Sequence, residues 1–169
     1  MNKGIIFAGG CFWGVQEYFS RLKGVELTKC LYIDGNTRNP RYEDLKNKVA
    51  THAEAVLIKY NNEIISLDNL LKHFLYIVDP FSINKQGEDE GIQYRSAIYY
   101  QSMSEKEYIT DYLKKYFSHK FNDVKIELKK RNQFYLAENY HQDYLKKNSS
   151  GYCHVSFDTI SDDEKRNYK

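Results

Sequence analysis

Apolar residues along this chain recur with two different spacings, and the spacing changes at turn residues. Short runs that are continuously apolar, or that alternate between apolar and polar residues, predict strands at 4–9, 25–33, 53–60, 92–100 and 124–128. The run "AEAVLIKY" alternates regularly, so one side of this strand is expected to face a core. The polar stretches "DGNTRNP" and "SINKQGEDEG" are rich in turn residues and are expected to be loops.

Other segments have apolar residues at helical spacing. The first begins close to Cys11, directly after a pair of glycines. The second is capped by Ser66, and the third begins with a capping box made by Ser104 and Glu107. The last predicted helix is "LAENYHQDYLKK", residues 136–147.

Strands and helices interleave without the glycine fingerprint of a dinucleotide-binding fold, which favours an α+β or α/β class. A chain of 169 residues is most simply one domain with its own core. We therefore expect a single domain over 1–157, followed by a charged, loosely held tail over 158–169.

Composition and charge narrow the range of functions. Apolar residues make up 41% of the chain, charged residues 28%, and the formal net charge is +2. No strongly basic or acidic surface is expected, which argues against a nucleic acid or a membrane as partner. The unusual feature is 16 tyrosines, most of which a tyrosine-rich core and surface would account for.

The chain has three cysteines, Cys11, Cys30 and Cys153, whose spacing matches neither a disulfide framework nor a zinc site. We expect no metal and no other cofactor. The stretch "IFAGGC" resembles a lipoprotein cleavage site, but its apolar run is far shorter than that of a signal peptide. The sequence thus predicts a cytoplasmic protein with reduced thiols.

Cys11 stands at a predicted strand-to-helix junction, in "AGGCFWG". The dipole and the free N–H groups of a helix N-terminus favour a thiolate there. The dipole contributes about 0.3–1 kcal/mol, less than one pKa unit, so another polar group or the substrate must complete the activation. The alternative is that Cys11 is a small buried residue. Trp13 lies outside the apolar stripe of the helix, which favours an aromatic wall beside a reactive thiol.

Several motifs follow one another along the chain: "GCFWG", "NPRYEDL", "HAEAV", "DP", "QGEDEGIQYRSAIY", "FYLAENYHQDYLKKN" and "GYC". In order and spacing they resemble those of the peptide methionine sulfoxide reductase A family. They extend from Ile5 to Cys153, which is nearly the whole chain. The resemblance implies an α+β sandwich with a ferredoxin-like core of mixed sheet and flanking helices.

The resemblance also implies a reaction. Cys11 corresponds to the cysteine that attacks the sulfur of a methionine S-sulfoxide, and Glu54, in "HAE", to the acid that protonates the departing oxygen. Phe12 and Trp13 correspond to the aromatic pair that holds the methyl group of the substrate.

Three more residues match the family's site. Tyr42, in "NPRY", and Tyr94, in "QYRS", correspond to the phenols that hydrogen-bond the sulfoxide oxygen. Asp89, in "GEDEG", corresponds to a carboxylate that helps to bind the substrate. Without the resemblance, a core position for Tyr94 and a surface position for Tyr42 are the alternatives.

Strand alternation places Glu54 on the same face as Val56 and Ile58. Burial on that face would raise the pKa of its carboxyl, and half-protonation near neutral pH requires about 3.7 kcal/mol. A protonated Glu54 also avoids repelling a Cys11 thiolate. The alternative is an ion pair between Glu54 and a lysine or arginine at the strand end.

The implied attack leaves a sulfenic acid on Cys11, which a second thiol must reduce. The resemblance assigns that thiol to Cys153 and assigns reduction of the resulting disulfide to thioredoxin. Cys30, on a predicted strand, is expected to be an inert packing residue, although Cys30 and an external thiol stay open as resolving groups. The tail holds no further cysteine, which excludes the two-step relay of some family members.

The chain departs from the family pattern at "LYIDGN", Val78 and Glu88, all outside the matched site. Two other functions remain: acyl transfer with Cys11 as nucleophile and a histidine as base, and an inactive module that binds methionine. No ordered Cys/His/Asn pattern supports acyl transfer. The sequence therefore favours a monomeric, thiol-dependent oxidoreductase that repairs oxidised proteins under oxidative stress. We expect it to use both peptide-bound and free methionine sulfoxide.

Overall fold

The computed structural model describes residues 2–151 and 154–167, and the centre of this part of the chain is a mixed sheet. The strands follow the order β7–β6–β1–β3–β2–β8, and neighbouring strands are antiparallel except for the parallel pair β6 and β7. Their bounds are β1 (Asn2–Gly9), β2 (Val25–Ile33), β3 (Ala53–Asn61), β6 (Ser96–Tyr100), β7 (Glu127–Lys130) and β8 (Phe134–Leu136). A separate small hairpin consists of β4 (Lys85–Gln86) and β5 (Asp89–Glu90).

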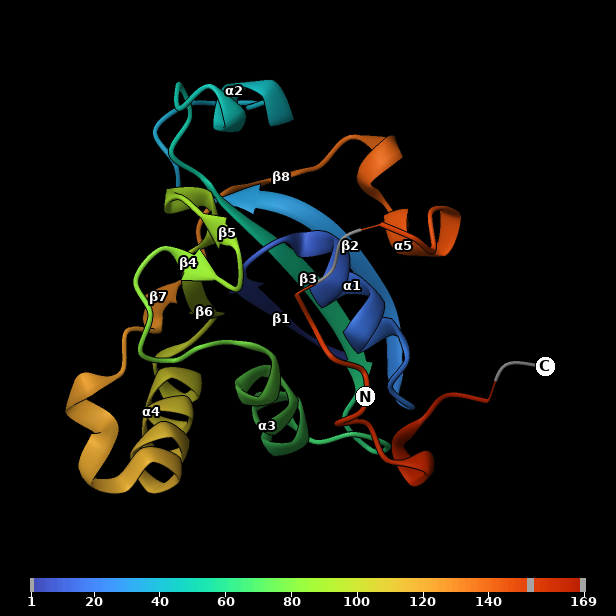
Figure 1. The fold of residues 1–169 in the computed structure, drawn as a ribbon. Coiled ribbons are helices and arrows are strands. Elements are labelled where there is room, and N and C mark those ends of the chain that lie inside the picture. The colour runs from blue at the N-terminus through green and yellow to red at the C-terminus, as the bar shows by residue number, and fades with distance from the viewer. Residues whose placement is uncertain (1, 152–153, 168–169) are drawn as a thin grey trace.

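Helices flank this sheet (Figure 1). Their bounds are α1 (Phe12–Ser20), α2 (Tyr42–Lys46), α3 (Leu67–Ile77), α4 (Met103–Phe117) and α5 (Tyr144–Lys147). Short 3-10 helices are formed by Ile92–Tyr94, Ser118–Asp123, Asn139–His141 and Asp162–Glu164. None of the helices described here is long and apolar enough to cross a membrane. The mixed sheet with flanking helices confirms the predicted α+β class.

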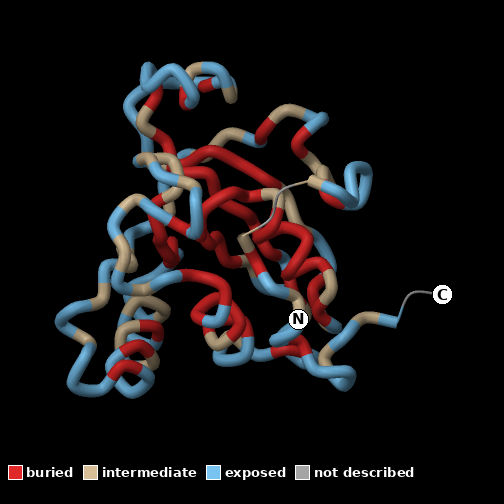
Figure 2. Tube along the Cα trace, viewed as in Figure 1, coloured by how far each residue is buried: buried red, intermediate tan, exposed pale blue. Residues whose placement is uncertain are grey.

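The main core lies between the sheet and helices α1 and α3. The ring of Phe7 on β1 stacks on Phe74 of α3 with centroids 4.6 Å apart, and lies 5.4 Å from the ring of Phe19 on α1. Gly9 allows this close packing, because a Cβ at that position would lie 2.9 Å from a methyl group of Val78. Buried residues accordingly follow the strands and the inner sides of the helices (Figure 2).

The sheet is strongly curved. Lys129 on β7 donates a hydrogen bond to Asp34, which follows β2, at 2.8 Å, although β6, β1 and β3 lie between those two strands. The other core cluster, on the face of the sheet opposite α1, is rich in small buried side chains, among them Ala8, Ala53, Ala55 and Ala97. Small residues leave room for the curvature on this side of the sheet.

Two helix starts test the predicted caps. The helix capped by Ser66 is confirmed, since its Oγ accepts a hydrogen bond from an N–H of the first turn of α3. The box of Ser104 and Glu107 is wrong, because α4 is capped by Ser102, whose Oγ accepts from the N–H of Glu105 at 3.2 Å. Ser102 and Ser104 could each cap the helix. With Ser102 as the cap, Glu105 also accepts a hydrogen bond from the backbone N–H of Gln101, before the helix.

The strand expected over 92–100 is shorter than predicted. Ile92–Tyr94 forms a 3-10 segment, and β6 begins only at Ser96. Within the predicted loop, residues 82–91, the chain also pairs with itself to form the β4–β5 hairpin. Tyr94 therefore belongs to a turn before the strand and not to a face of the sheet.

The helix predicted over 136–147 is largely wrong. Only Tyr144–Lys147 is α-helical, and Asp143 before it has a left-handed backbone with φ of 55°. The side chain of Gln142 bonds both the N–H and the carbonyl of Cys30, each at 2.9 Å. These tertiary hydrogen bonds fix the segment against β2 and replace the helical bonds that its sequence favours.

The tail after Phe157 makes specific contacts as far as the structure describes it. His73 on α3 donates to Glu164 at 2.6 Å, because a carboxylate only accepts, and its other ring nitrogen then accepts from the hydroxyl of Tyr18 at 2.6 Å. Ile160 is buried, and Lys165 forms a β-bridge with Leu22. The segment up to residue 166 is thus tied to α1 and α3 by individual contacts, although most of its residues are exposed.

Candidate active site

Cys11 is the N-cap of α1, at the junction that the sequence predicts. Its side chain is only 8% exposed. The turn before it depends on Gly10, whose φ of 90° lies in the region that favours glycine. Strand β1 and helix α1 therefore place Cys11 at a mostly buried turn between them.

Glu54 lies on β3, with its side chain buried at 1% exposure. Burial raises the pKa of its carboxyl to about 8, a hydrogen bond from the N–H of Phe12 opposes this rise, and the charge of Asp89 adds to it. That hydrogen bond measures 3.3 Å to Oε1. No lysine or arginine among the described residues contributes to this pKa, in contrast to the alternative of an ion pair. Glu54 is thus a protonated acid at neutral pH, beside the residue that follows Cys11.

Two phenols share this environment. Burial, followed by the charges of Glu54 and Cys11, raises the pKa of Tyr42 to about 12. Burial and the charge of Glu54 also raise the pKa of Tyr94, with smaller contributions from Tyr42, Asp89 and Cys11. Both phenols therefore remain protonated and can donate hydrogen bonds. Both side chains are partly buried. Tyr42 is therefore not fully on the surface and Tyr94 is not in the core, in contrast to the alternatives considered for them.

Asp89 lies on β5, in the small hairpin beside this cluster. Burial raises the pKa of its carboxyl, and the charge of Glu88 adds to the rise. Its Oδ2 is buried and has no hydrogen-bond partner among the described residues. A buried acceptor without a partner is costly, and a polar group of a bound molecule would relieve that cost.

Aromatic rings form a wall around Phe12 and Trp13, the two residues that follow Cys11. Trp13 stacks on Tyr144 with ring centroids 3.8 Å apart and an angle of 11° between the planes. Its indole N–H donates to Nδ1 of His141 at 3.0 Å. Phe12 is buried, with its ring 5.1 Å from His141 and 5.7 Å from Tyr32. The partly exposed Trp13 fits its place outside the core stripe, and His141 is held as part of the wall.

Sequence reasoning missed the role of Glu138. Its carboxylate accepts from the hydroxyl of Tyr32 at 2.8 Å and from the backbone N–H of Tyr42 at 3.0 Å. It therefore fixes the start of α2 against β2, where Tyr32 pairs directly with Glu54. The sequence signal for this role was the carboxylate inside the motif "AENYHQ", but the partners of Glu138 are more than 90 residues away in sequence.

The two remaining cysteines are Cys30 and Cys153. Cys30 on β2 is fully buried, and its thiol donates to Oε1 of Gln16 at 3.1 Å. Burial raises the pKa of Cys30 well above its usual value, which keeps the thiol protonated. Cys153 lies outside the described residues.

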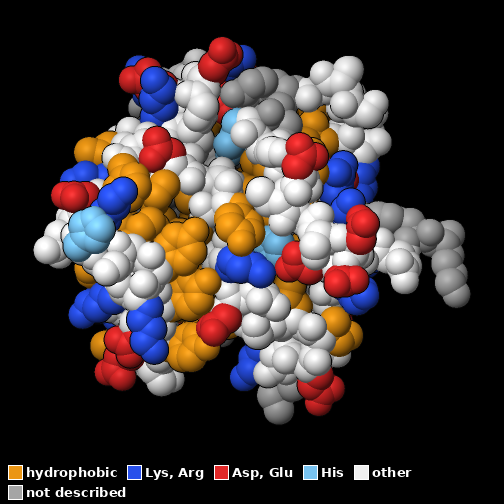
Figure 3. Space-filling view, turned by 60° about the horizontal axis from the view of Figure 1, so that its bottom comes forward, with side chains coloured by type: hydrophobic (Ala, Val, Ile, Leu, Met, Phe, Trp, Pro, Cys, Tyr) orange, Lys and Arg blue, Asp and Glu red, His pale blue; other side chains and the backbone are white. Residues whose placement is uncertain are grey.

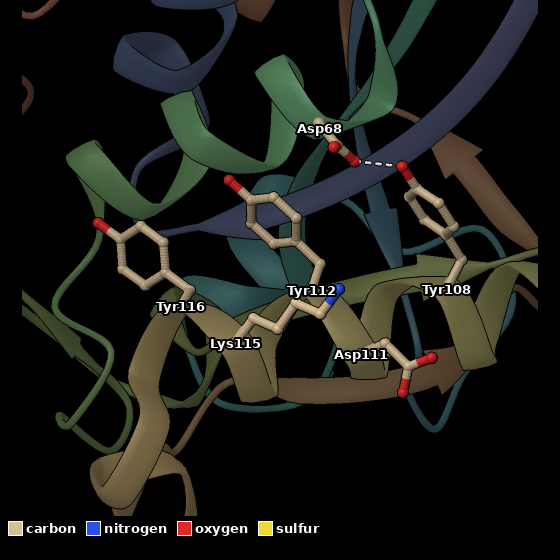
Figure 4. A pocket seen from close by; sticks show the side chains of 6 residues that line it. All are labelled: Asp68, Tyr108, Asp111, Tyr112, Lys115 and Tyr116. Carbon is tan, nitrogen blue, oxygen red and sulfur yellow. Dashed lines mark hydrogen bonds between the residues drawn. The ribbon is translucent and has the colours of Figure 1, made fainter.

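A hollow elsewhere on the molecule is separate from this cluster. It lies along α4 and is lined by Asp68, Tyr108, Asp111, Tyr112, Lys115 and Tyr116 (Figure 4). It shares no residue with the predicted site and accounts for some of the tyrosine excess. In the part of the chain that the structure covers, no group of three or more His, Cys, Asp or Glu side chains is arranged to hold a metal ion.

A comparison with known families identifies the chain. A family model described as peptide methionine sulfoxide reductase matches residues 3–169. The chain belongs to this family. It is thus a methionine sulfoxide reductase of the MsrA type, an oxidoreductase, as its motifs indicate.

Curated relatives and solved structures agree with this assignment. The peptide methionine sulfoxide reductase MsrA of Clostridium perfringens is 49% identical over 159 residues, which cover 92% of this chain and 99% of the relative. The reduced form of Mxr1 from Saccharomyces cerevisiae has a TM-score of 0.83 and 29% identity, with 92% of this chain and 91% of that chain covered. A structure of Mxr1 in complex with Trx2, 22% identical with a TM-score of 0.57, shares the fold over 85% of this chain and 84% of that one.

Proposed function

We propose that this reductase acts on the S epimer of methionine sulfoxide, in peptides and as the free amino acid, with Cys11 as nucleophile and Glu54 as acid. The observation that carries the proposal is the buried Glu54, whose pKa of about 8 keeps a proton on a carboxyl bonded to the N–H of Phe12, the residue after Cys11. A general acid acts best when its pKa lies near the working pH.

In the proposed reaction the sulfur of Cys11 attacks the sulfoxide sulfur while Glu54 protonates the oxygen. The attack forms an S–S bond to the substrate; the S–O bond of the substrate and this S–S bond then break and an S–O bond to Cys11 forms, so that methionine and a cysteine sulfenic acid are produced. The substrate sulfur gains two electrons and the thiol sulfur loses two. No metal or organic cofactor enters this balance.

The other members of the cluster bind and orient the substrate in this proposal. Tyr42 and Tyr94 donate hydrogen bonds to the sulfoxide oxygen, where negative charge develops. Phe12 and Trp13 hold the methyl group against the aromatic wall, and Asp89 binds a polar group of the substrate. The raised pKa values of both tyrosines support the donor roles, because each phenol keeps its proton.

Recycling follows by thiol chemistry. We propose that Cys153 condenses with the sulfenic acid of Cys11, releasing water and forming a disulfide, which thioredoxin then reduces. The buried, hydrogen-bonded thiol of Cys30 supports Cys153 in preference to Cys30 as the resolving group. The Trx2 partner named for the yeast relative supports a thioredoxin as reductant. The cellular role that fits this reaction is repair of oxidised proteins by a monomer in the cytoplasm.

The proposal is tested by turnover of the separated S and R epimers of a blocked methionine sulfoxide, with dithiothreitol as reductant and Cys11→Ser as control. Reduction of the S epimer alone, lost in Cys11→Ser, is the expected result. Binding of the sulfoxide without turnover would favour a binding module, and thioester formation with an activated acyl compound would favour acyl transfer.

A further inference from the structure

Two side chains from distant parts of the chain lie against Gly10. A Cβ at this position would come within 2.7 Å of the Cβ of Gln86 and 2.9 Å of Cε1 of His154. Gln86 belongs to β4, and His154 belongs to the segment after α5. The space where a side chain at Gly10 would lie is therefore filled by Gln86 and His154.

His154 is also bonded to the turn. Its Nε2 lies 2.9 Å from the carbonyl oxygen of Gly9. A carbonyl only accepts, so Nε2 carries the proton and donates it. Burial lowers the pKa of His154, although the bond to Gly9 opposes this, and the ring stays neutral with that single N–H.

Gln86 is fixed from its other end. It is 2% exposed, and its Oε1 accepts from the backbone N–H of Asp79 at 2.8 Å. Its Nε2 donates a hydrogen bond of 2.5 Å to Oγ of Ser96, which is the first residue of β6. The aliphatic part of Gln86 therefore presses on Gly10 from a position that the sheet determines.

We propose that Gln86 and His154 form a clamp that positions Cys11 for attack, an inference that rests on the proposed function. Two consecutive glycines have more backbone freedom than any other dipeptide, so the turn alone does not fix the thiol. Misplacing a reacting group by about 1 Å costs up to about 100-fold in rate. The clamp restricts Gly9 and Gly10 to one backbone conformation and acts on the thiol through that backbone, so both residues are positioning residues.

The test uses Gln86→Ala, His154→Ala and His154→Gln in the full chain, with His73→Ala as a matched buried histidine that does not contact the turn. Two rates are measured: methionine formation in a single turnover at varied concentrations of the S epimer, and alkylation of Cys11 by iodoacetamide, followed by mass spectrometry. Melting temperatures report stability separately.

We expect both alanine variants to lower the maximal single-turnover rate about tenfold, with less than about twofold change in the half-saturating concentration. His154→Gln should stay within about threefold of the parent rate, because the glutamine amide can donate to Gly9. His73→Ala should lower only the melting temperature. The alkylation rate of Cys11 should change in the alanine variants and return in His154→Gln.

Unchanged rates in Gln86→Ala and His154→Ala would overturn the clamp, as would an equal loss in His154→Gln and His154→Ala. Should His154→Ala fail to fold, Gln86→Ala decides by the same rates. If the parent protein does not reduce the sulfoxide, the proposed function fails, while the alkylation rates still decide whether the clamp positions the thiol.

Discussion

The backbone N–H of Phe12 donates to Oε1 of Glu54 at 3.3 Å, which joins the residue after Cys11 to the buried acid on β3. The bond fixes one carboxyl oxygen at the N-terminus of α1. The other oxygen can then carry the proton toward the site. The first turn of the helix thus positions the thiol and the acid together.

Glu54→Gln should abolish the acid without removing this bond. The glutamine carbonyl still accepts from Phe12, but the amide has no proton of suitable acidity, so methionine formation should slow by about 10²- to 10⁴-fold. Single-turnover kinetics measure this loss. The exposed Glu26→Gln is the control and should keep the parent rate. A loss of less than threefold in Glu54→Gln would contradict the acid role.

The pKa of Glu54 also predicts a pH dependence. Its pKa is about 8 in the folded chain and 4.5 when unperturbed, so the folded state binds the extra proton between these values. The contribution of Glu54 to the free energy of unfolding is fully present below pH 4.5. It falls as the pH rises and is lost above about pH 8. The rate of methionine formation should fall as the pH rises through about 8, where Glu54 loses its proton.

Urea unfolding of the parent and of Glu54→Gln, between pH 6 and pH 9, measures this contribution to the free energy of unfolding. The parent should lose stability relative to the variant as the pH rises. A constant difference between the two proteins across this range would show that Glu54 does not titrate there.

Trp13→Ala should weaken substrate binding more than it slows the chemical step. The change removes the stack on Tyr144 and an apolar surface that contributes about 1.5–3 kcal/mol when covered, so KM should rise about tenfold or more. Steady-state kinetics with dithiothreitol measure KM and kcat. Tyr116→Ala, in the hollow along α4, is the control. A fall in kcat with an unchanged KM would assign Trp13 to the chemistry instead.

The two remaining cysteines should respond differently to serine. Cys153→Ser should keep one turnover and slow thioredoxin-driven recycling, because its thiol is the proposed resolving group. Cys30→Ser should retain recycling within about threefold, since a serine hydroxyl can also donate to Gln16. The rate of thioredoxin oxidation measures both. The reverse pattern would make Cys30 the resolving cysteine.

The sequence predicted those elements whose pattern is local. Regular alternation predicted β3 and the face that carries Glu54, and an N-cap serine predicted the start of α3. The prediction of a helix over 136–147 was wrong because Gln142 bonds the backbone of β2. Its partner Cys30 is more than 100 residues away in sequence, and helical spacing does not encode such a contact.

The same limit applies to the site. Cys11 and its glycines stand in one contiguous motif, which is why their junction was predictable. Glu138, Gln86 and His154 act on residues far from them in sequence, and each is an ordinary polar residue until the fold brings it to its partner. Composition showed an excess of tyrosine but not where it gathers. Figure 3 shows hydrophobic side chains exposed together on the face that lies at the bottom of the view in Figure 1.

The most direct test of the account is one turnover of the Cys153→Ser variant without reductant, in which the sulfenic acid is trapped with dimedone and located by mass spectrometry. We expect one methionine per chain from the S epimer and one trapped oxidation, on the peptide that contains Cys11. Methionine formed with Cys11 unmodified, or a folded protein that forms none, would contradict the claim that oxygen passes from the sulfoxide to this thiol.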